Sequence, residues 1–210
     1  MQHSLDCLLG GFRTLQHNEV RDLVADCLRE ARFPGVEVEP QLQPLSGESF
    51  KLKTTNTDED ARSDVKCVGF WRRLRQAYFD IKVLAPCARS YLSKSHKQLY
   101  QEAEQSKNRE YKRRINEIEH ADFSPLIFTT AGGMGPQSQL FLKRITQHLS
   151  EIRETHPSVT AGWLRCRFSF ALLRTTLIYL RGSRGKKKKF VSPIPVDFDV
   201  ERAVRSRIAY

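Results

Sequence analysis

The sequence has few features of a secreted or membrane protein. Its five cysteines are odd in number and never form a CxxC pair, a pattern typical of a reducing compartment rather than of a disulfide framework. The first ten residues show no cationic start followed by a long apolar run, so we expect no signal peptide. The longest apolar candidate, residues 161–180, contains Arg165, Arg167 and Arg174. Three guanidinium groups would be very costly at membrane depth, so we expect a soluble helix here and no membrane partner.

Acidic residues are scarce relative to basic ones. Lys and Arg number 35 against 24 Asp and Glu, which gives a net charge of +11 over 210 residues. Such an excess favours polyanions as partners, because each contact with a phosphate releases condensed counterions. Charge alone leaves nucleic acids and anionic membranes both open. The hydrophobic content of 40% excludes a wholly disordered chain, and the length suits one domain of ordinary size.

The spacing of apolar residues predicts an α/β domain with no internal repeat. A stripe at helical spacing from Val20 to Ala31 predicts a first helix, with Asn18 as its N-cap and Pro34-Gly35 as its end. Strands are predicted at residues 35–39, 65–70, 77–84 and 123–130, and helices at 91–120, 137–154 and 159–181, with a polar loop at 44–62. Antiparallel pairing of the first three strands and a helical crossover before the fourth would give a mixed sheet.

A charged triplet, Asp80-Ile81-Lys82, interrupts the most apolar of these strands. Because side chains alternate along a strand, Asp80 and Lys82 share one face, and Asp64 begins the preceding strand. Hydrolysis of a phosphodiester by a divalent metal needs hard oxygen ligands, usually two carboxylates, and gains from a fixed cation. The pattern therefore indicates a centre of Asp64, Asp80 and Lys82. The structural alternative is an ordinary ion pair of Asp80 and Lys82 on a solvated face.

These residues carry a resemblance to a known group of nucleases. Asp64 followed by Asp80-Ile81-Lys82, behind a helix that contains Glu19, resembles the PD-(D/E)xK, or restriction-endonuclease-like, superfamily, whose common core runs α-β-β-β-α-β. More closely, segments 17–22, 69–71, 79–83, 123–135 and 180–184 resemble the endonuclease-like domain of mobile-element proteins in invertebrate genomes, over roughly residues 3–184. Such domains are similar to those that follow a reverse transcriptase in retrotransposons and nick target DNA.

The resemblance implies a metal-dependent DNA endonuclease. Asp64 and Asp80 would bind Mg²⁺ or Mn²⁺, Lys82 would act on the water and the phosphate, and Glu19 would add an acidic group from the first helix. Ser63 stands where the superfamily has its proline, so the motif is incomplete. Two alternatives stay open: a catalytically inactive nucleic-acid-binding remnant of a retrotransposon protein, and a polyprotein fragment with no independent role.

Basic residues around the proposed centre are expected to contact DNA phosphates rather than bases. They are Arg72, Arg73, Lys107, Arg109, Lys112, Arg113 and Arg114. The structural alternative for each is ordinary solvated charge. The basic run at residues 182–189 would serve equally as a nuclear import signal, which favours the nucleus over the cytoplasm.

The expected organisation has three segments: an N-terminal remnant at residues 1–16, the endonuclease-like domain at 17–184 and a basic flexible tail at 185–210. His3 and Cys7 have the spacing of half a zinc knuckle. The cysteine pair that would complete it is missing, so we expect no zinc, and we expect either a fragment of a longer element or a lost zinc site. An upstream reverse transcriptase in a longer polyprotein is one expected partner, and a homodimer stays open.

Two further features have simpler interpretations. His17, near the start of the first helix, is expected to be a structural hydrogen-bonding group, although a base is the alternative. The glycine-rich residues 132–135 lack the GK[ST] ending of a phosphate-binding loop, so they predict a turn between a strand and a helix.

Overall fold

A four-stranded mixed sheet forms the centre of the computed structural model, which describes residues 12–43 and 62–181. The strands are β1 (Glu37–Val38), β2 (Val65–Val68), β3 (Gln76–Leu84) and β4 (Asp122–Thr129), and they lie in that order across the sheet. β1 pairs with β2, and β2 with β3, in antiparallel fashion, whereas β3 and β4 run parallel. The mixed α/β fold expected from the sequence is therefore confirmed.

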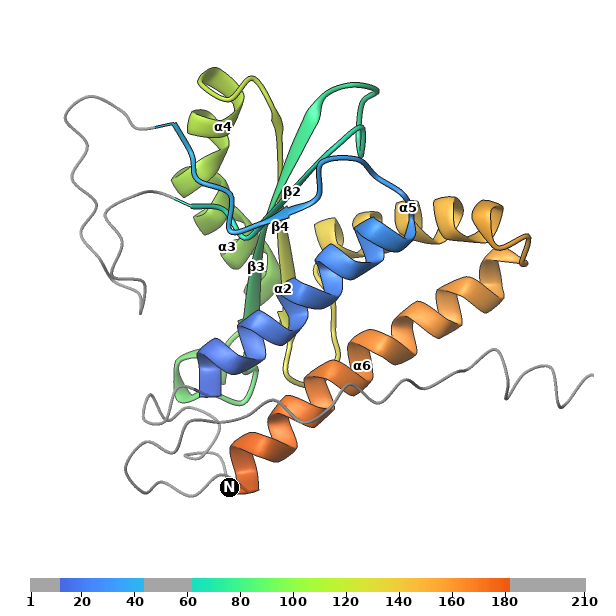
Figure 1. Ribbon diagram of the computed structural model, residues 1–210. Coiled ribbons are helices and arrows are strands. Elements are labelled where there is room, and N and C mark those ends of the chain that lie inside the picture. Colours follow the sequence, from blue (N-terminus) through green and yellow to red (C-terminus); the bar gives the residue numbers. More distant parts are fainter. Residues whose placement is uncertain (1–11, 44–61, 182–210) are drawn as a thin grey trace, which may run out of the picture.

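Helices cover both faces of this sheet (Figure 1). On one face lie α2 (Phe12–Glu30), α5 (Pro136–Ile152) and α6 (Pro157–Arg181), and on the other lie α3 (His96–Lys107), the π-helical turn η2 (Asn108–Lys112) and α4 (Arg113–Glu117). Side chains alternate along β3, so the strand contributes to the core on both faces of the sheet. Phe79 and Ile81 pack on the face of α2 and α5. Tyr78 and Leu84 pack on the face of α3 and α4. Among the described residues, no helix is both long and apolar enough to cross a membrane.

Helix α2 begins earlier than the sequence indicates. It starts at Phe12, so Asn18 lies inside the helix and the prediction that it caps the N-terminus is wrong. Residues 12–16, grouped above with the N-terminal remnant, form the first turns of α2, and Gln16 Nε2 donates a hydrogen bond to Thr175 Oγ1 of α6 at 3.2 Å. This long-range contact joins the first turns of α2 to α6, and a local cap signal cannot reveal it.

The charged segment predicted as one long helix over residues 91–120 is divided. A short 3₁₀ turn, η1 (Arg89–Tyr91), precedes α3, and a capping box starts α3: Gln98 N donates to Ser95 Oγ at 3.3 Å and Ser95 N donates to Gln98 Oε1 at 3.0 Å. After α3 the backbone passes through η2 into α4. π-Helical turns are rare and occur frequently at functional sites.

The predictions on zinc at the N-terminus and on the C-terminal tail concern residues outside the described part of the chain. His3 and Cys7 fall in residues 1–11, the basic run falls in residues 182–210, and most of the polar loop falls in residues 44–61.

An aromatic cluster anchors the sheet to α5. Phe70 is fully buried, and its ring centroid lies 5.0 Å from that of Phe79, 5.1 Å from that of Phe141 and 5.2 Å from that of Phe33. The Trp71 ring lies nearly perpendicular to the Phe70 ring, with 4.6 Å between their centroids. Because Phe70 lies just past β2 and contacts β3 and α5 at once, it joins the sheet to this helical layer.

Replacing Phe70 with Ala is expected to lower the free energy of unfolding by about 3–5 kcal/mol, the usual cost of deleting a buried aromatic ring. Urea denaturation followed by circular dichroism measures this loss. Leu74→Ala, in the turn before β3, serves as the control because Leu74 is 84% exposed, and we expect a change of about 0.5 kcal/mol or less. Equal effects of the two variants would contradict the central position of Phe70.

Candidate active site

Asp64 lies where β2 parts from β3. The pairing of the two strands ends with Val65 opposite Phe79. Beyond this point Asp64 Oδ2 accepts a hydrogen bond from the backbone N–H of Ile81 at 2.5 Å, and the Ser63 hydroxyl donates to the Phe79 carbonyl at 3.0 Å. At the end of the strand pair, hydrogen bonds from side chains thus take the place of the backbone hydrogen bonds between β2 and β3. Both bonds hold Asp64 in place relative to β3.

Asp80 lies on the sheet face covered by α3 and η2, and it is only 4% exposed. Its Oδ2 atom lies 2.9 Å from Lys107 Nζ in an ion pair. Burial and the nearby charge of Asp64 raise the pKa of Asp80 to about 7, and the charge of Lys107 works in the opposite direction. The two carboxylates are therefore close enough to repel each other, and ionised Asp80 depends on a cation beside it.

Two lysines flank Asp80, and their pKa values move in opposite directions. Lys82 is half-buried, and burial together with the charge of Lys107 lowers its pKa. Burial also opposes the charge of Lys107, but the attraction of Asp80 outweighs it, so the pKa of Lys107 is raised. The sequence left open an ordinary ion pair between Asp80 and Lys82, but the structure pairs Asp80 with Lys107 instead. Of the two lysines, Lys82 therefore releases its proton more readily.

His17 contacts the other aspartate. Its Nε2 atom lies 3.1 Å from Asp64 Oδ2, and the side chain is 31% exposed. Burial lowers the pKa of His17, but the bond to Asp64 and the charges of Asp64 and Asp80 outweigh it, so the pKa is raised. Asp64 Oδ2 therefore accepts from the Ile81 amide and contacts the imidazole, while its Oδ1 atom has no hydrogen-bond partner among the described residues.

The π-helical turn η2 completes the surroundings of Lys107. Lys107 Nζ lies 5.2 Å from the centroid of the Tyr111 ring and 3.8 Å from Glu110 Oε2. Burial and the charge of Asp80 raise the pKa of the Tyr111 hydroxyl above its ordinary value. Tyr111 and Glu110 were not predicted from the sequence as members of this site, because only the fold brings η2 over β3.

Glu19, the acidic residue expected from the first helix, points elsewhere. It forms an ion pair with Arg174 of α6, and no contact joins it to Asp64 or Asp80 within the described part of the chain. The structure thus brings Asp64, Asp80 and Lys82 together but not Glu19. His17 is the residue of α2 that reaches the site.

The basic residues expected to contact phosphates have different surroundings. Arg73, Arg109 and Lys112 are exposed. Arg113 is exposed but paired with Glu117 at 3.0 Å, and Arg72 lies 4.0 Å from Asp122. Arg114 is only 8% exposed and donates to the Gln43 carbonyl, so its guanidinium supports the fold. Lys107 faces Asp80 rather than solvent.

Asp64 and Asp80 suit a small divalent cation with few protein ligands. Asp80 Oδ2 is buried and accepts no hydrogen bond of regular geometry from the described residues. Its charge is offset by the Lys107 ammonium group, with which it forms an ion pair. Within residues 12–43 and 62–181, no group of three or more His, Cys, Asp or Glu side chains is placed to hold a metal. Mg²⁺ is commonly held by one or two carboxylates together with waters and substrate phosphates, and the two aspartates fit this kind of site.

Asp80→Asn is expected to change the pH dependence of stability. In the wild-type protein the folded chain holds the Asp80 proton more tightly than the unfolded chain, so the contribution of Asp80 to stability falls as pH rises from about 4 to about 7. Asn cannot ionise, so the melting temperature of Asp80→Asn should rise relative to wild type across this range. The measurement is thermal unfolding with EDTA present.

Asp26→Asn is the matched control for this measurement, because Asp26 is exposed on α2 and pairs with Arg29 of the same helix at 2.9 Å. Its melting temperature should follow wild type at a constant offset. If the Asp80→Asn curve also runs parallel to wild type, the raised pKa of Asp80 is wrong.

Comparison with known protein families and with curated proteins identifies no relative of this chain. No model of a known protein family matches the chain, and no curated protein is significantly similar to it. Function is therefore inferred from the arrangement of Asp64, Asp80, Lys82 and Lys107.

Proposed function

We propose that the chain is a divalent-metal-dependent DNA endonuclease of the restriction-endonuclease-like kind. The observation that carries the proposal is the meeting of Asp64 and Asp80 at the end of the β2–β3 pair, with Lys82 on the same strand as Asp80. The chain order α2, β1, β2, β3, α3, β4 supports it, because it follows the α-β-β-β-α-β order of that superfamily's core.

Each residue of the site has a distinct role in this proposal. Asp64 and Asp80 would hold Mg²⁺ or Mn²⁺, which when bound supplies Lewis-acid chemistry at the phosphate and lowers the pKa of its water. Lys82, with its lowered pKa, exchanges a proton at Nζ near neutral pH more readily than an exposed lysine. His17 and the Ile81 amide keep the Asp64 carboxylate oriented.

The turn η2 presents positive charge next to the site. The Lys107 ammonium group is engaged with Asp80 at 2.9 Å, whereas Arg109 and Lys112 follow on η2 with exposed side chains. A phosphate backbone entering here would meet these two exposed cations, in a chain with a net charge of +11. DNA would be held mainly through its backbone.

Nicking of supercoiled plasmid with Mg²⁺ or Mn²⁺ tests the activity. We expect Asp64→Asn and Asp80→Asn each to reduce the rate by about 100-fold or more, because each removes a proposed ligand. Lys82→Met should lose nicking while still binding Mn²⁺, which electron paramagnetic resonance of free Mn²⁺ measures. Asp26→Asn is the control and should nick like wild type. Nicking by Asp80→Asn at the wild-type rate would overturn the proposal.

One observation favours a second candidate, an inactive nucleic-acid-binding remnant. Lys107 already neutralises Asp80, so the ion pair would persist if the site had lost its metal. In the active enzyme the metal must compete with this ammonium group, and Lys107→Met should therefore bind Mn²⁺ more tightly than wild type. In the remnant, neither protein binds Mn²⁺, and both bind DNA in EDTA.

The expected cellular context rests on the same proposal. A mobile-element nuclease would act on DNA in the nucleus, next to a reverse transcriptase in a longer polyprotein, and a homodimer would allow cuts in two strands. The basic run expected to direct nuclear import falls in residues 182–210, outside the described part of the chain.

A further inference from the structure

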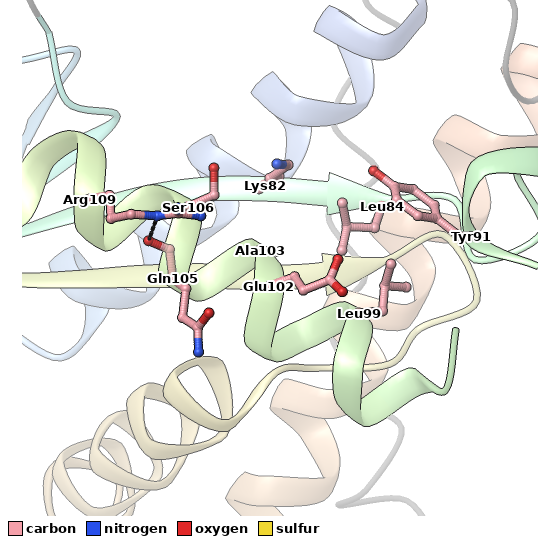
Figure 2. A pocket seen from close by; sticks show the side chains of 9 residues that line it. All are labelled: Lys82, Leu84, Tyr91, Leu99, Glu102, Ala103, Gln105, Ser106 and Arg109. Atoms are coloured by element: carbon pink, nitrogen blue, oxygen red, sulfur yellow. Dashed lines mark hydrogen bonds between the residues drawn. The ribbon is translucent and has the colours of Figure 1, made fainter. Parts of the chain in front are cut away.

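A pocket of about 350 Å³ lies between β3 and α3, beside the proposed active site (Figure 2). Lys82 belongs to both, because it follows Asp80 on the same face of β3 and also lines the pocket. β3 pairs with β2 only as far as Phe79, so among the described strands β4 is the partner of the half of β3 that carries Lys82 and Leu84. The pocket lies along this half of the strand.

One end of the pocket is aromatic and mainly apolar, and the carboxylate of Glu102, which forms an ion pair with Lys94, lies beside it. Leu84, Leu99 and the ring of Tyr91 gather there, as Figure 2 shows, and Ala103 continues the apolar surface along α3. Leu84, Leu99 and Ala103 belong to one buried cluster, which Tyr91 packs against, so this wall is backed by packed side chains. A flat ring bordered by aliphatic groups suits the face of a nucleobase.

The other end is polar and cationic. Arg109, Ser106 and Gln105 lie there, with Lys82 between the two ends (Figure 2). Arg109 Nε approaches the Gln105 carbonyl at 3.4 Å, which holds the guanidinium near the helix. Lys82 and Arg109 offer charge to phosphates, whereas Ser106 and Gln105 offer both hydrogen-bond donors and acceptors.

We propose that this pocket receives a single unpaired nucleotide, with its base at the Tyr91 end and its phosphates toward Lys82 and Arg109. The volume is at the lower end of the range for small-ligand sites, about 300–1,000 Å³, which admits one nucleotide but no base pair in a duplex. The inference deepens the proposed nuclease function by naming its substrate: DNA with an unpaired nucleotide beside the bond to be cut. Strands that are already unpaired enter without the cost of unstacking a base.

Binding to DNA in EDTA tests the pocket separately from catalysis. The probes are a short fluorescein-labelled single strand and a blunt duplex of the same sequence, measured by fluorescence anisotropy. Tyr91→Ala should weaken binding of the single strand by about 5-fold or more and leave the duplex almost unchanged. Tyr91→Phe keeps the ring and should bind both probes like wild type.

A second pair of variants tests the space itself. Ser106 is exposed at the mouth of the pocket, so Ser106→Trp should fill it and weaken binding of the single strand, whereas Ser106→Ala should not. Circular dichroism and thermal unfolding confirm that each variant is folded. Equal loss of both probes, or no loss of the single strand in Tyr91→Ala and Ser106→Trp, overturns the proposal.

The outcomes separate the pocket from the nuclease. If wild type binds as expected but cleaves neither the plasmid nor the labelled single strand with Mn²⁺, the nuclease proposal fails and the nucleotide pocket stands. If wild type nicks and Asp80→Asn does not, while the Tyr91 and Ser106 variants bind the single strand like wild type, the nuclease stands and the pocket proposal is wrong.

Discussion

Asp80 is a buried aspartate in the middle of a mainly apolar strand, covered by a helix and close to a second aspartate. Removing a carboxylate from water is costly unless a cation accompanies it. The layer above β3 meets that need, because the end of α3 brings Lys107 to Asp80 and η2 brings Tyr111 and Glu110 around Lys107. The helical layer and the site therefore depend on the same ion pair.

The second aspartate depends on the sheet rather than on the helix. Where β2 ends, the Ser63 hydroxyl bonds the Phe79 carbonyl and the Asp64 carboxylate bonds the Ile81 amide. Proline has no hydroxyl group and could not donate the first of these bonds. Ser63 thus adds a bond that the proline of the proposed restriction-endonuclease-like motif could not supply, and Asp64 is held in place without that proline.

Local patterns predicted the sheet and the shared face of Asp80 and Lys82, because alternation along a strand is a local property. They could not predict the partners of these residues. Lys107 is separated from Asp80 by a loop and a helix, and its position follows from how that helix packs. Glu19 was misjudged for the same reason: α6 packs against α2, and Arg174 of α6 pairs with it. From the sequence, the helical spacing of apolar residues showed only that Glu19 lies beside the apolar stripe of the first helix, not which side chain it contacts.

The basic residues between α3 and α4 have different surroundings, which the run of like charge in the sequence does not reveal. From the sequence, Lys107, Arg109 and Arg114 formed one cationic stretch. In the structure, Lys107 neutralises Asp80, Arg109 lines the pocket and Arg114 donates to the Gln43 carbonyl. Because a π-helical turn follows α3, the three side chains leave the helix in different surroundings. Their positive charge is therefore divided among an ion pair, a binding surface and the protein interior, and only the second is available to a phosphate without rearrangement.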